Sequence, residues 1–207
     1  MRRVRATSRI LTAAPSRGRV VITSIVLVCA CKPSGEATEP ASTQSVEVGE
    51  TGELAGAQSP TLLTTAALQA IVDAPDREEA DREADLRRQP VDLLAFIGLA
   101  PGMRVADIGA GFGYMTELLA RSVGPEGTVY GQNSPFVLDR FAREGWNARL
   151  AKPINQGVLS LERPFDDPFP DEVGDLDRVV NVLFYHDFEW MGVDRAAHVA
   201  DVFAALR

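Results

Sequence analysis

The chain has 207 residues, of which 45% are hydrophobic and 24% charged, values that exclude a collagen-like chain and one disordered throughout. The formal net charge is −8, yet residues 1–30 hold six arginines and no acid, which leaves 15 basic and 29 acidic side chains in the remainder. Nucleic-acid backbones favour basic surfaces, so we expect no nucleic-acid partner for so acidic a body.

The first predicted element is a signal peptide over residues 1–30. An apolar run over residues 20–30 follows the arginines. As a helix it spans roughly 16 Å, about half of the ~30 Å hydrocarbon core, so it is too short to cross a membrane. A positive segment, a short apolar segment and small residues at its end are typical of a secretory signal peptide.

The end of this run resembles the lipobox of bacterial lipoprotein signal peptides, in the residues Leu27-Val28-Cys29-Ala30-Cys31. The resemblance implies cleavage before Cys31 and a lipid on Cys31, which would anchor the chain to a membrane on the periplasmic side of the bacterial envelope. The alternatives are an uncleaved apolar anchor or a misassigned start codon, and a misassigned start leaves a cytoplasmic protein. The chain has no other cysteine and only two histidines, so we expect no metal site.

Residues 31–60 form the predicted linker that follows the signal peptide. They are rich in Ser, Thr, Gly, Pro and Glu and contain almost no large apolar side chain. Such a segment buries too little to offset the entropy of ordering, so we expect a flexible tether. The folded domain is then residues 61–207.

Helical and strand patterns alternate along this domain. Helices are predicted at 62–71, 76–88, 91–98, 114–122, 135–144 and 194–206, and strands at 103–108, 128–133, 158–162 and 175–182. This alternation predicts an α/β fold with a parallel sheet and helices on both faces. Ligands then bind at the carboxyl ends of the strands.

Two of these helices carry further expectations. The charged segment 76–88 is expected to be a solvated helix face, and the alternative is that an arginine in it reaches an anionic ligand: Arg82, Arg87 or Arg88. The last helix is expected to bury an apolar face made of Ala196, Val199, Ala200, Phe203 and Leu206.

A glycine cluster follows the first predicted strand. Gly109, Gly111 and Gly113 allow a tight turn and a close approach of backbone N–H groups to a ligand, and Asp107 lies two residues ahead of them. The helix that follows directs its positive end to the same place. The dinucleotide-binding pattern needs its third glycine at position 114, which is Tyr114, so a nicotinamide oxidoreductase is disfavoured.

This segment resembles motif I of the class I S-adenosylmethionine-dependent methyltransferases, and the resemblance extends from about residue 77 to residue 207. More narrowly, four segments resemble a bacterial group of predicted methyltransferases that often carry signal peptides: 81–90, 94–96, 101–103 and 181–187. The resemblance implies a doubly wound Rossmann-like sheet with S-adenosylmethionine as cofactor. Four residues match the loop that holds its methionine part and ribose: Asp107, Gly109, Gly111 and Gly113.

Two further cofactor positions follow from the resemblance. The family holds the ribose hydroxyls with an acid at the end of the second strand, where this chain has Asn133, with Gln132 as the alternative. The acid that faces the adenine after the third strand corresponds to Asp166, with Asp167 as the alternative. For both acids the competing interpretation is a capped turn within residues 164–168.

The residues after the fourth strand line the acceptor pocket in the family. Here Phe184 is followed by Tyr185, His186 and Asp187, the predicted catalytic residues, and His186 is the candidate base near neutral pH. The competing interpretation is that Tyr185 packs while His186 and Asp187 cap a turn. We expect His198 to lie at the surface or to take part in packing.

The chain stops after the helix that follows the fourth strand, whereas the family continues with a fifth strand and further elements. The resemblance therefore implies a sheet truncated at this point. Two functions remain: an S-adenosylmethionine-dependent methyltransferase that acts on an unknown small molecule, and a non-catalytic envelope lipoprotein that keeps the fold as a binding or structural module. If the domain is exported, it is separated from S-adenosylmethionine, which is made in the cytoplasm. The sequence does not indicate an oligomeric state.

Overall fold

The computed structural model describes residues 60–207. The predicted signal peptide, the lipidation site Cys31 and nearly all of the predicted linker lie outside the described residues. Within residues 60–207, no helix has both the length and the apolar character needed to cross a membrane.

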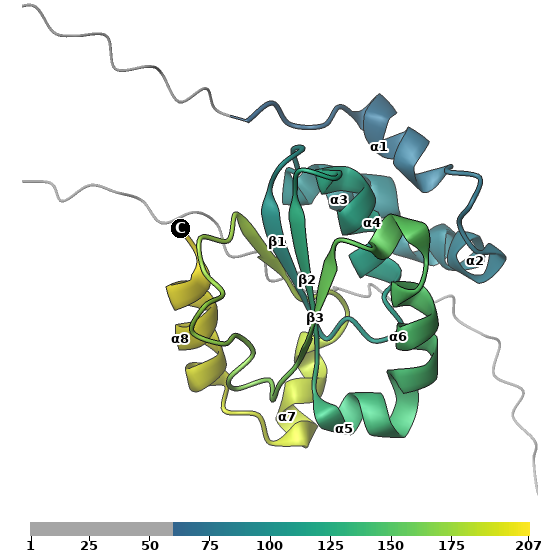
Figure 1. The fold of residues 1–207 in the computed structure, drawn as a ribbon. Helices are drawn as coiled ribbons and strands as arrows, with labels where there is room; N and C mark the ends of the chain where they lie inside the picture. The colour runs from purple at the N-terminus through teal and green to yellow at the C-terminus, as the bar shows by residue number, and fades with distance from the viewer. Residues whose placement is uncertain (1–59) are drawn as a thin grey trace, which may run out of the picture.

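The centre of the fold is a four-stranded parallel sheet with the strand order β3-β2-β1-β4. The strands are β1 (Arg104–Ile108), β2 (Thr128–Asn133), β3 (Val158–Glu162) and β4 (Arg178–Val180). The chain passes outward from β1 to β3 and then returns to place β4 on the other side of β1 (Figure 1). This reversal of direction confirms the predicted doubly wound α/β class, and it puts the ligand-binding crevice of such folds between β1 and β4.

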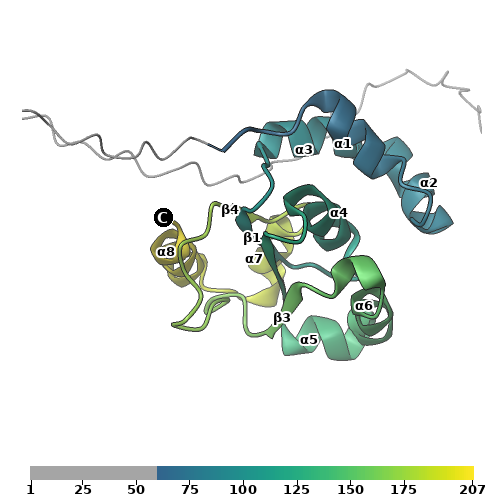
Figure 2. The same cartoon turned by 45° about the horizontal axis from the view of Figure 1, so that its top comes forward.

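Helices cover both faces of the sheet, and Figure 2 shows the first three together on one side. That face packs against α1 (Thr65–Val72), α3 (Pro90–Ile97) and α4 (Tyr114–Val123), and α2 (Glu79–Arg88) lies beside them. The other core takes side chains from α5 (Pro135–Val137), the π-helical turn η1 (Leu138–Ala142), α6 (Arg143–Leu150), α7 (Phe188–Met191) and α8 (Arg195–Ala205). The 3₁₀ turns η2 (Pro153–Asn155) and η3 (Tyr185–Asp187) complete the connections.

All but one of the predicted elements agree with the structure within three residues at each end. The helix predicted to end near residue 144 continues as α6 to Leu150. The strand predicted over 175–182 shortens to β4, Arg178–Val180. Asp175 and Leu183 have φ values of +53° and +58°, which end the extended backbone just outside residues 176–182.

The apolar face predicted for the last helix is wrong. Val199 and Phe203 are 42% and 52% exposed, whereas the buried side chains of α8 are those of His198, Val202 and Ala205. Both sets have helical spacing, so periodicity alone did not separate them. The choice is made by a polar contact, because the Nδ1 atom of His198 lies 2.6 Å from the carbonyl oxygen of Phe165 and turns that side of α8 inward.

Candidate functional site

The glycine loop connects β1 to α4 at the carboxyl edge of the sheet. Gly109, Gly111 and Gly113 have φ values of +70°, +57° and +83°, a region that side chains rarely adopt. A Cβ at position 113 would lie 2.8 Å from Cγ of Arg149, so Gly113 is needed for packing. Around a Cβ at position 111 the nearest atom is 4.0 Å away, so the space over Gly111 is open.

Two amide side chains of β2 fix this loop. The backbone N–H of Gly111 donates to Oδ1 of Asn133 at 2.8 Å, and Nδ2 of Asn133 donates to the carbonyl oxygen of Gly111 at 3.2 Å. Oε1 of Gln132 accepts from the N–H of Gly109 at 3.3 Å, while its Nε2 donates to the carbonyl of Arg163 at 2.7 Å. Both side chains are fully buried, so both predicted ribose-binding amides are occupied by the backbone.

Asp107 lies beneath the loop and is 2% exposed. The hydroxyl of Thr116 donates to its Oδ2 at 2.6 Å. Burial raises the pKa of the Asp107 carboxyl to about 7, because the hydrogen bond from Thr116 and the charge of Arg88 offset the loss of hydration only in part. Near neutral pH this carboxyl therefore changes charge readily, and a cation placed against it would favour the ionised form.

Three hollows line the carboxyl edge of the sheet. The loop hollow has a volume of about 180 Å³ and is lined by Asp107, the loop residues 109–112, Arg88 and Phe184, among others. The helix hollow, of about 590 Å³, lies against α2 and α3. The aromatic hollow, also about 590 Å³, is lined by residues that include Ser134, Phe136, Phe165, Asp166 and Trp190. The two larger hollows have the size of small-molecule sites.

Phe184 stands between the loop hollow and the aromatic hollow. Its ring occupies the space that a Cβ on Gly109 would need, with Cδ1 2.5 Å from that point. The ring centroid is 5.0 Å from that of Phe165, which lines the aromatic hollow. Gly109 is therefore required for close packing as well as for its φ, and the aromatic pair separates the predicted methionine and adenine sites.

The predicted catalytic residues Tyr185, His186 and Asp187 do not line any of the three hollows. The side chain of His186 is 73% exposed, and its Nε2 lies 3.4 Å from Oδ1 of Asp187. That same oxygen accepts a hydrogen bond of 2.9 Å from the indole N–H of Trp190. Tyr185 packs on Phe188, with ring centroids 5.2 Å apart. The structure thus places Leu183 and Phe184, and not the predicted three, beside the glycine loop.

Asp166, the residue predicted to face the adenine, is exposed and lines the aromatic hollow. Its neighbour Asp167 pairs instead with Arg163. The segment that carries Asp166 is held by α8 at two points. His198 contacts the carbonyl of Phe165, and the N–H of Phe169 donates to Oδ2 of Asp201 at 3.0 Å. His198 is therefore a packing residue, as predicted, and it also positions a wall of this hollow.

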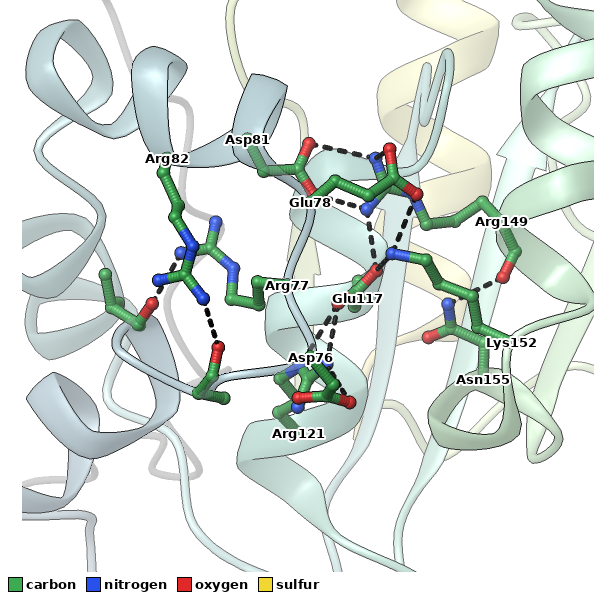
Figure 3. A network of polar contacts seen from close by, with 12 residues as sticks. Asp76, Arg77, Glu78, Asp81, Arg82, Glu117, Arg121, Arg149, Lys152 and Asn155 are labelled. Carbon is green, nitrogen blue, oxygen red and sulfur yellow. Dashed lines mark hydrogen bonds and ion pairs between the residues drawn. The ribbon is translucent and has the colours of Figure 1, made fainter.

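A buried charge network supports the loop from behind, and it was not foreseen from the sequence (Figure 3). Arg149 of α6 pairs with Asp81 of α2 and, at 2.6 Å, with Glu117 of α4, and its Nε donates to the carbonyl of Phe112 in the loop at 3.2 Å. Glu117 also binds Lys152 and Arg121, at 2.9 and 2.8 Å. One carboxylate thus joins three cations, and the network ties α2, α4 and α6 to the glycine loop.

The expectation that segment 76–88 is a solvated helix face holds only in part, because most of its side chains are exposed but Arg77 and Asp81 are only 5% and 6% exposed. Arg77 forms a two-pronged pair with Asp85 at 2.6 and 2.9 Å. Of the three arginines considered for an anion, Arg82 donates to the carbonyl of Ala74. Arg87 and Arg88 line the helix hollow, and Arg88 also lines the loop hollow. Residues 60–207 contain no cluster of three or more His, Cys, Asp or Glu side chains arranged for a metal ion.

Comparison with protein families gives a match to the region just described. The model of the protein-L-isoaspartate (D-aspartate) O-methyltransferase family matches residues 88–144, which run from the last residue of α2 through the glycine loop into the start of α6. A comparison with curated protein sequences found no match. The matched region holds Arg88, Asp107, the three loop glycines and Asn133.

Solved structures resemble the chain at low identity. One is a SAM-dependent methyltransferase from Aquifex aeolicus, with 18% identity, 70% of this chain and 68% of that chain covered and a TM-score of 0.47. Another is a SAM-dependent O-methyltransferase from Thermotoga maritima, with 18% identity, 68% of this chain and 46% of that chain covered and a TM-score of 0.39. A third is a protein-L-isoaspartate O-methyltransferase, with 22% identity, 44% and 27% covered and a TM-score of 0.35. The chain spans less than half of the last two.

Proposed function

We propose that this domain binds S-adenosylmethionine at the glycine loop and transfers its methyl group to a small molecule. The observation that carries the proposal is the open cradle over Gly111, set between buried Asp107 and two hollows of small-molecule size. The family match over residues 88–144 supports it, because it falls on this loop and its neighbours.

The residues at the loop fit the chemistry of this cofactor. Asp107 lines the loop hollow, and we assign it to the ammonium of the methionine part, whose carboxylate then faces the start of α4. The loop brings backbone N–H groups and the positive end of α4 to the same hollow, since no side chain caps α4 at Gly113. Asp166 and the rings of the aromatic hollow suit an adenine. Asn133 remains the candidate for the ribose hydroxyls, which it would reach only on release of Gly111.

When bound, S-adenosylmethionine supplies an electrophilic methyl group on a sulfonium sulfur. The contribution of this chain is mainly to position the two reactants, which is worth on the order of 7–11 kcal/mol for a well-oriented pair. A base is needed only where the accepting atom carries a proton. We keep His186 as the proposed base, with Tyr185 and Asp187 as its neighbours. Because these residues line none of the three hollows, His186 reaches a bound acceptor only if residues 184–187 move. His186→Gln then lowers turnover without changing cofactor affinity.

Calorimetric titration of the full-length chain with S-adenosylmethionine and with its demethylated product tests the proposal. We expect micromolar binding that is lost in Gly111→Ala, because the new Cβ projects into the cradle. Gly102→Ala is the matched control, since Gly102 also has a positive φ, +81°, and nothing within 4 Å. Absence of binding by a folded sample would favour the second candidate, a non-catalytic lipoprotein that keeps the fold as a binding module.

We also propose export and lipid attachment at Cys31, which rests on the lipobox-like sequence alone. Incorporation of labelled palmitate in a bacterial host tests it. Cys31→Ser is expected to abolish labelling, and Cys29→Ser is expected to retain it. Labelling of neither the unchanged chain nor Cys29→Ser would leave the uncleaved apolar anchor and the cytoplasmic protein as the alternatives.

A further inference from the structure

The helix hollow is continuous with the loop hollow. Five residues line both: Arg88, Tyr114, Met115, Val182 and Leu183. A molecule in the helix hollow would therefore lie next to whatever occupies the glycine loop. At about 590 Å³ it is more than three times the size of the loop hollow, and the cofactor assignment above leaves it free. Its lining identifies the chemical class of its occupant.

Two arginines give this hollow a positive wall in an otherwise acidic body. Arg77, Arg121 and Arg149 nearby are each paired with a carboxylate. In contrast, neither Arg87 nor Arg88 forms an ion pair within residues 60–207. Asp92 also lines the hollow, which leaves one positive charge in excess.

Arg88 is held in place by an aromatic ring. Its guanidinium lies 4.5 Å from the centroid of Tyr114, close enough for a cation–π interaction. The hydroxyl of Tyr114 donates to Oδ1 of Asp85 at 2.6 Å, so the ring itself is fixed. Arg88 therefore presents a preorganised charge at the border of the two hollows, which is the geometry that favours recognition of an anion.

The remaining wall is apolar. It is formed by Leu93, Phe96, Met115, Val182 and Leu183. Phe96 and Leu183 are 65% and 47% exposed, so the hollow opens onto apolar surface. Leu183 is in a left-handed conformation, with φ of +58°, which a leucine rarely adopts and which persists only where its surroundings impose it.

We infer that the helix hollow binds the methyl acceptor, and that this acceptor is a small organic anion with an apolar body. The identification as acceptor rests on the proposed methyltransferase function, whereas the binding of such an anion does not. Arg87 and Arg88 hold the anionic group, and the wall from Leu93 to Leu183 covers the apolar part.

Four probes of the full-length chain test the need for an anionic group and for an apolar body separately: decanoate, acetate, decan-1-ol and decyltrimethylammonium. We expect decanoate to bind at least about tenfold more tightly than the other three, since a charge-assisted hydrogen bond and apolar burial each contribute. Equal binding of decanoate and decyltrimethylammonium would overturn the inference. Binding of the chain to anionic phospholipid vesicles, with no binding of free decanoate, would overturn the inference as well.

Arg87→Gln is the deciding variant, because Arg87 lines the helix hollow and not the loop hollow. We expect it to weaken decanoate binding on the order of fivefold, as suits an exposed charge. Arg140→Gln is the matched control, since Arg140 is an exposed arginine of η1 that lines neither hollow. An equal effect of both substitutions would contradict the assignment.

Titration of S-adenosylmethionine into the same samples keeps the two proposals apart. Arg87→Gln is expected to leave cofactor affinity unchanged. Binding of the cofactor without decanoate would end the inference and leave the proposed function in place. Binding of decanoate without the cofactor would end the proposed function and leave an anion-binding hollow.

Discussion

Asn133 and Gly111 hold each other by two hydrogen bonds, one in each direction, between the end of β2 and the middle of the glycine loop. An amide is the side-chain group that supplies a donor and an acceptor in this way, and a carboxylate supplies acceptors only. Asn133, at the end of β2, is thus matched to the loop backbone. The loop's shape depends on it.

Asn133→Ala is the first prediction. It leaves both backbone groups of Gly111 without their partner, so we expect a loss of about 1–3 kcal/mol in the free energy of unfolding and weaker binding of S-adenosylmethionine. Asn133→Asp keeps the acceptor for the Gly111 N–H and is expected to cost less. Urea denaturation and calorimetry measure the two effects. Unchanged stability in Asn133→Ala would mean that the loop keeps its shape without this pair.

The second prediction is that ligand affinity depends on pH through Asp107. Because the pKa of Asp107 in the folded protein is about 7, affinity for a ligand with an ammonium group falls about tenfold for each pH unit below 7. Asp107→Asn removes this dependence and lowers affinity at pH 8. Titration of S-adenosylmethionine between pH 5.5 and pH 8.5 tests it, with Asp171→Asn, an exposed acid, as the control.

The same residue has the opposite effect on stability without ligand. Its folded pKa lies above the unfolded value of 3.8, so its favourable contribution is present below pH 3.8 and is lost as pH rises through about 7. We therefore expect Asp107→Asn to be more stable than the unchanged chain at pH 8, by on the order of a few kcal/mol, and to lose this advantage near pH 4. A destabilised variant at pH 8 would contradict the expected charge state.

The sequence sufficed for the sheet and for the glycine loop, because both depend on local features. Short strand patterns predicted all four strands, three of them within one residue, and the position of Gly109 after β1 predicted the tight turn. The close packing at Gly131 was not predicted. A Cβ there would lie 2.3 Å from Cη2 of Trp146, a contact between β2 and α6 that no local pattern indicates.

The charge network was missed because its members are far apart in the chain. Arg149 and Asp81 are separated by 68 residues, and each looks like a surface charge in its own segment. The position of His186 was missed for another reason. The strand before it is shorter than predicted and Leu183 turns the chain, so Phe184 lines the loop hollow and the three residues after it do not.

Glu117 gives the third prediction. Burial alone would raise its pKa, but hydrogen bonds from Arg149, Arg121 and Lys152 outweigh burial and lower the pKa to about 2. Since the unfolded value is 4.5, the stability that this carboxylate provides is present above pH 4.5 and is lost as pH falls through about 2. Glu117→Gln is expected to destabilise the domain by about 3–5 kcal/mol at pH 7, as for a broken buried pair.

Acid titration of stability distinguishes this effect from simple loss of packing. The difference in unfolding free energy between Glu117→Gln and the unchanged chain should narrow between pH 4.5 and pH 2. Glu144→Gln is the control, because Glu144 is an exposed residue of α6. A difference that stays constant over this range would show that the carboxylate charge is not what stabilises the network.

His198 carries the last prediction. Burial lowers the pKa of His198 below 6.5, although its bond to the Phe165 carbonyl opposes this, so the neutral ring with its proton on Nδ1 is the folded form. The unfolded chain takes up the proton first, so stability falls as pH drops below 6.5. His198→Phe removes this dependence but leaves the Phe165 carbonyl without its donor. We therefore expect lower stability at pH 7.5, a flatter profile between pH 7 and pH 5, and weaker cofactor binding, because the wall that carries Asp166 loses its anchor. A profile as steep as that of the unchanged chain would assign the pH dependence to another group.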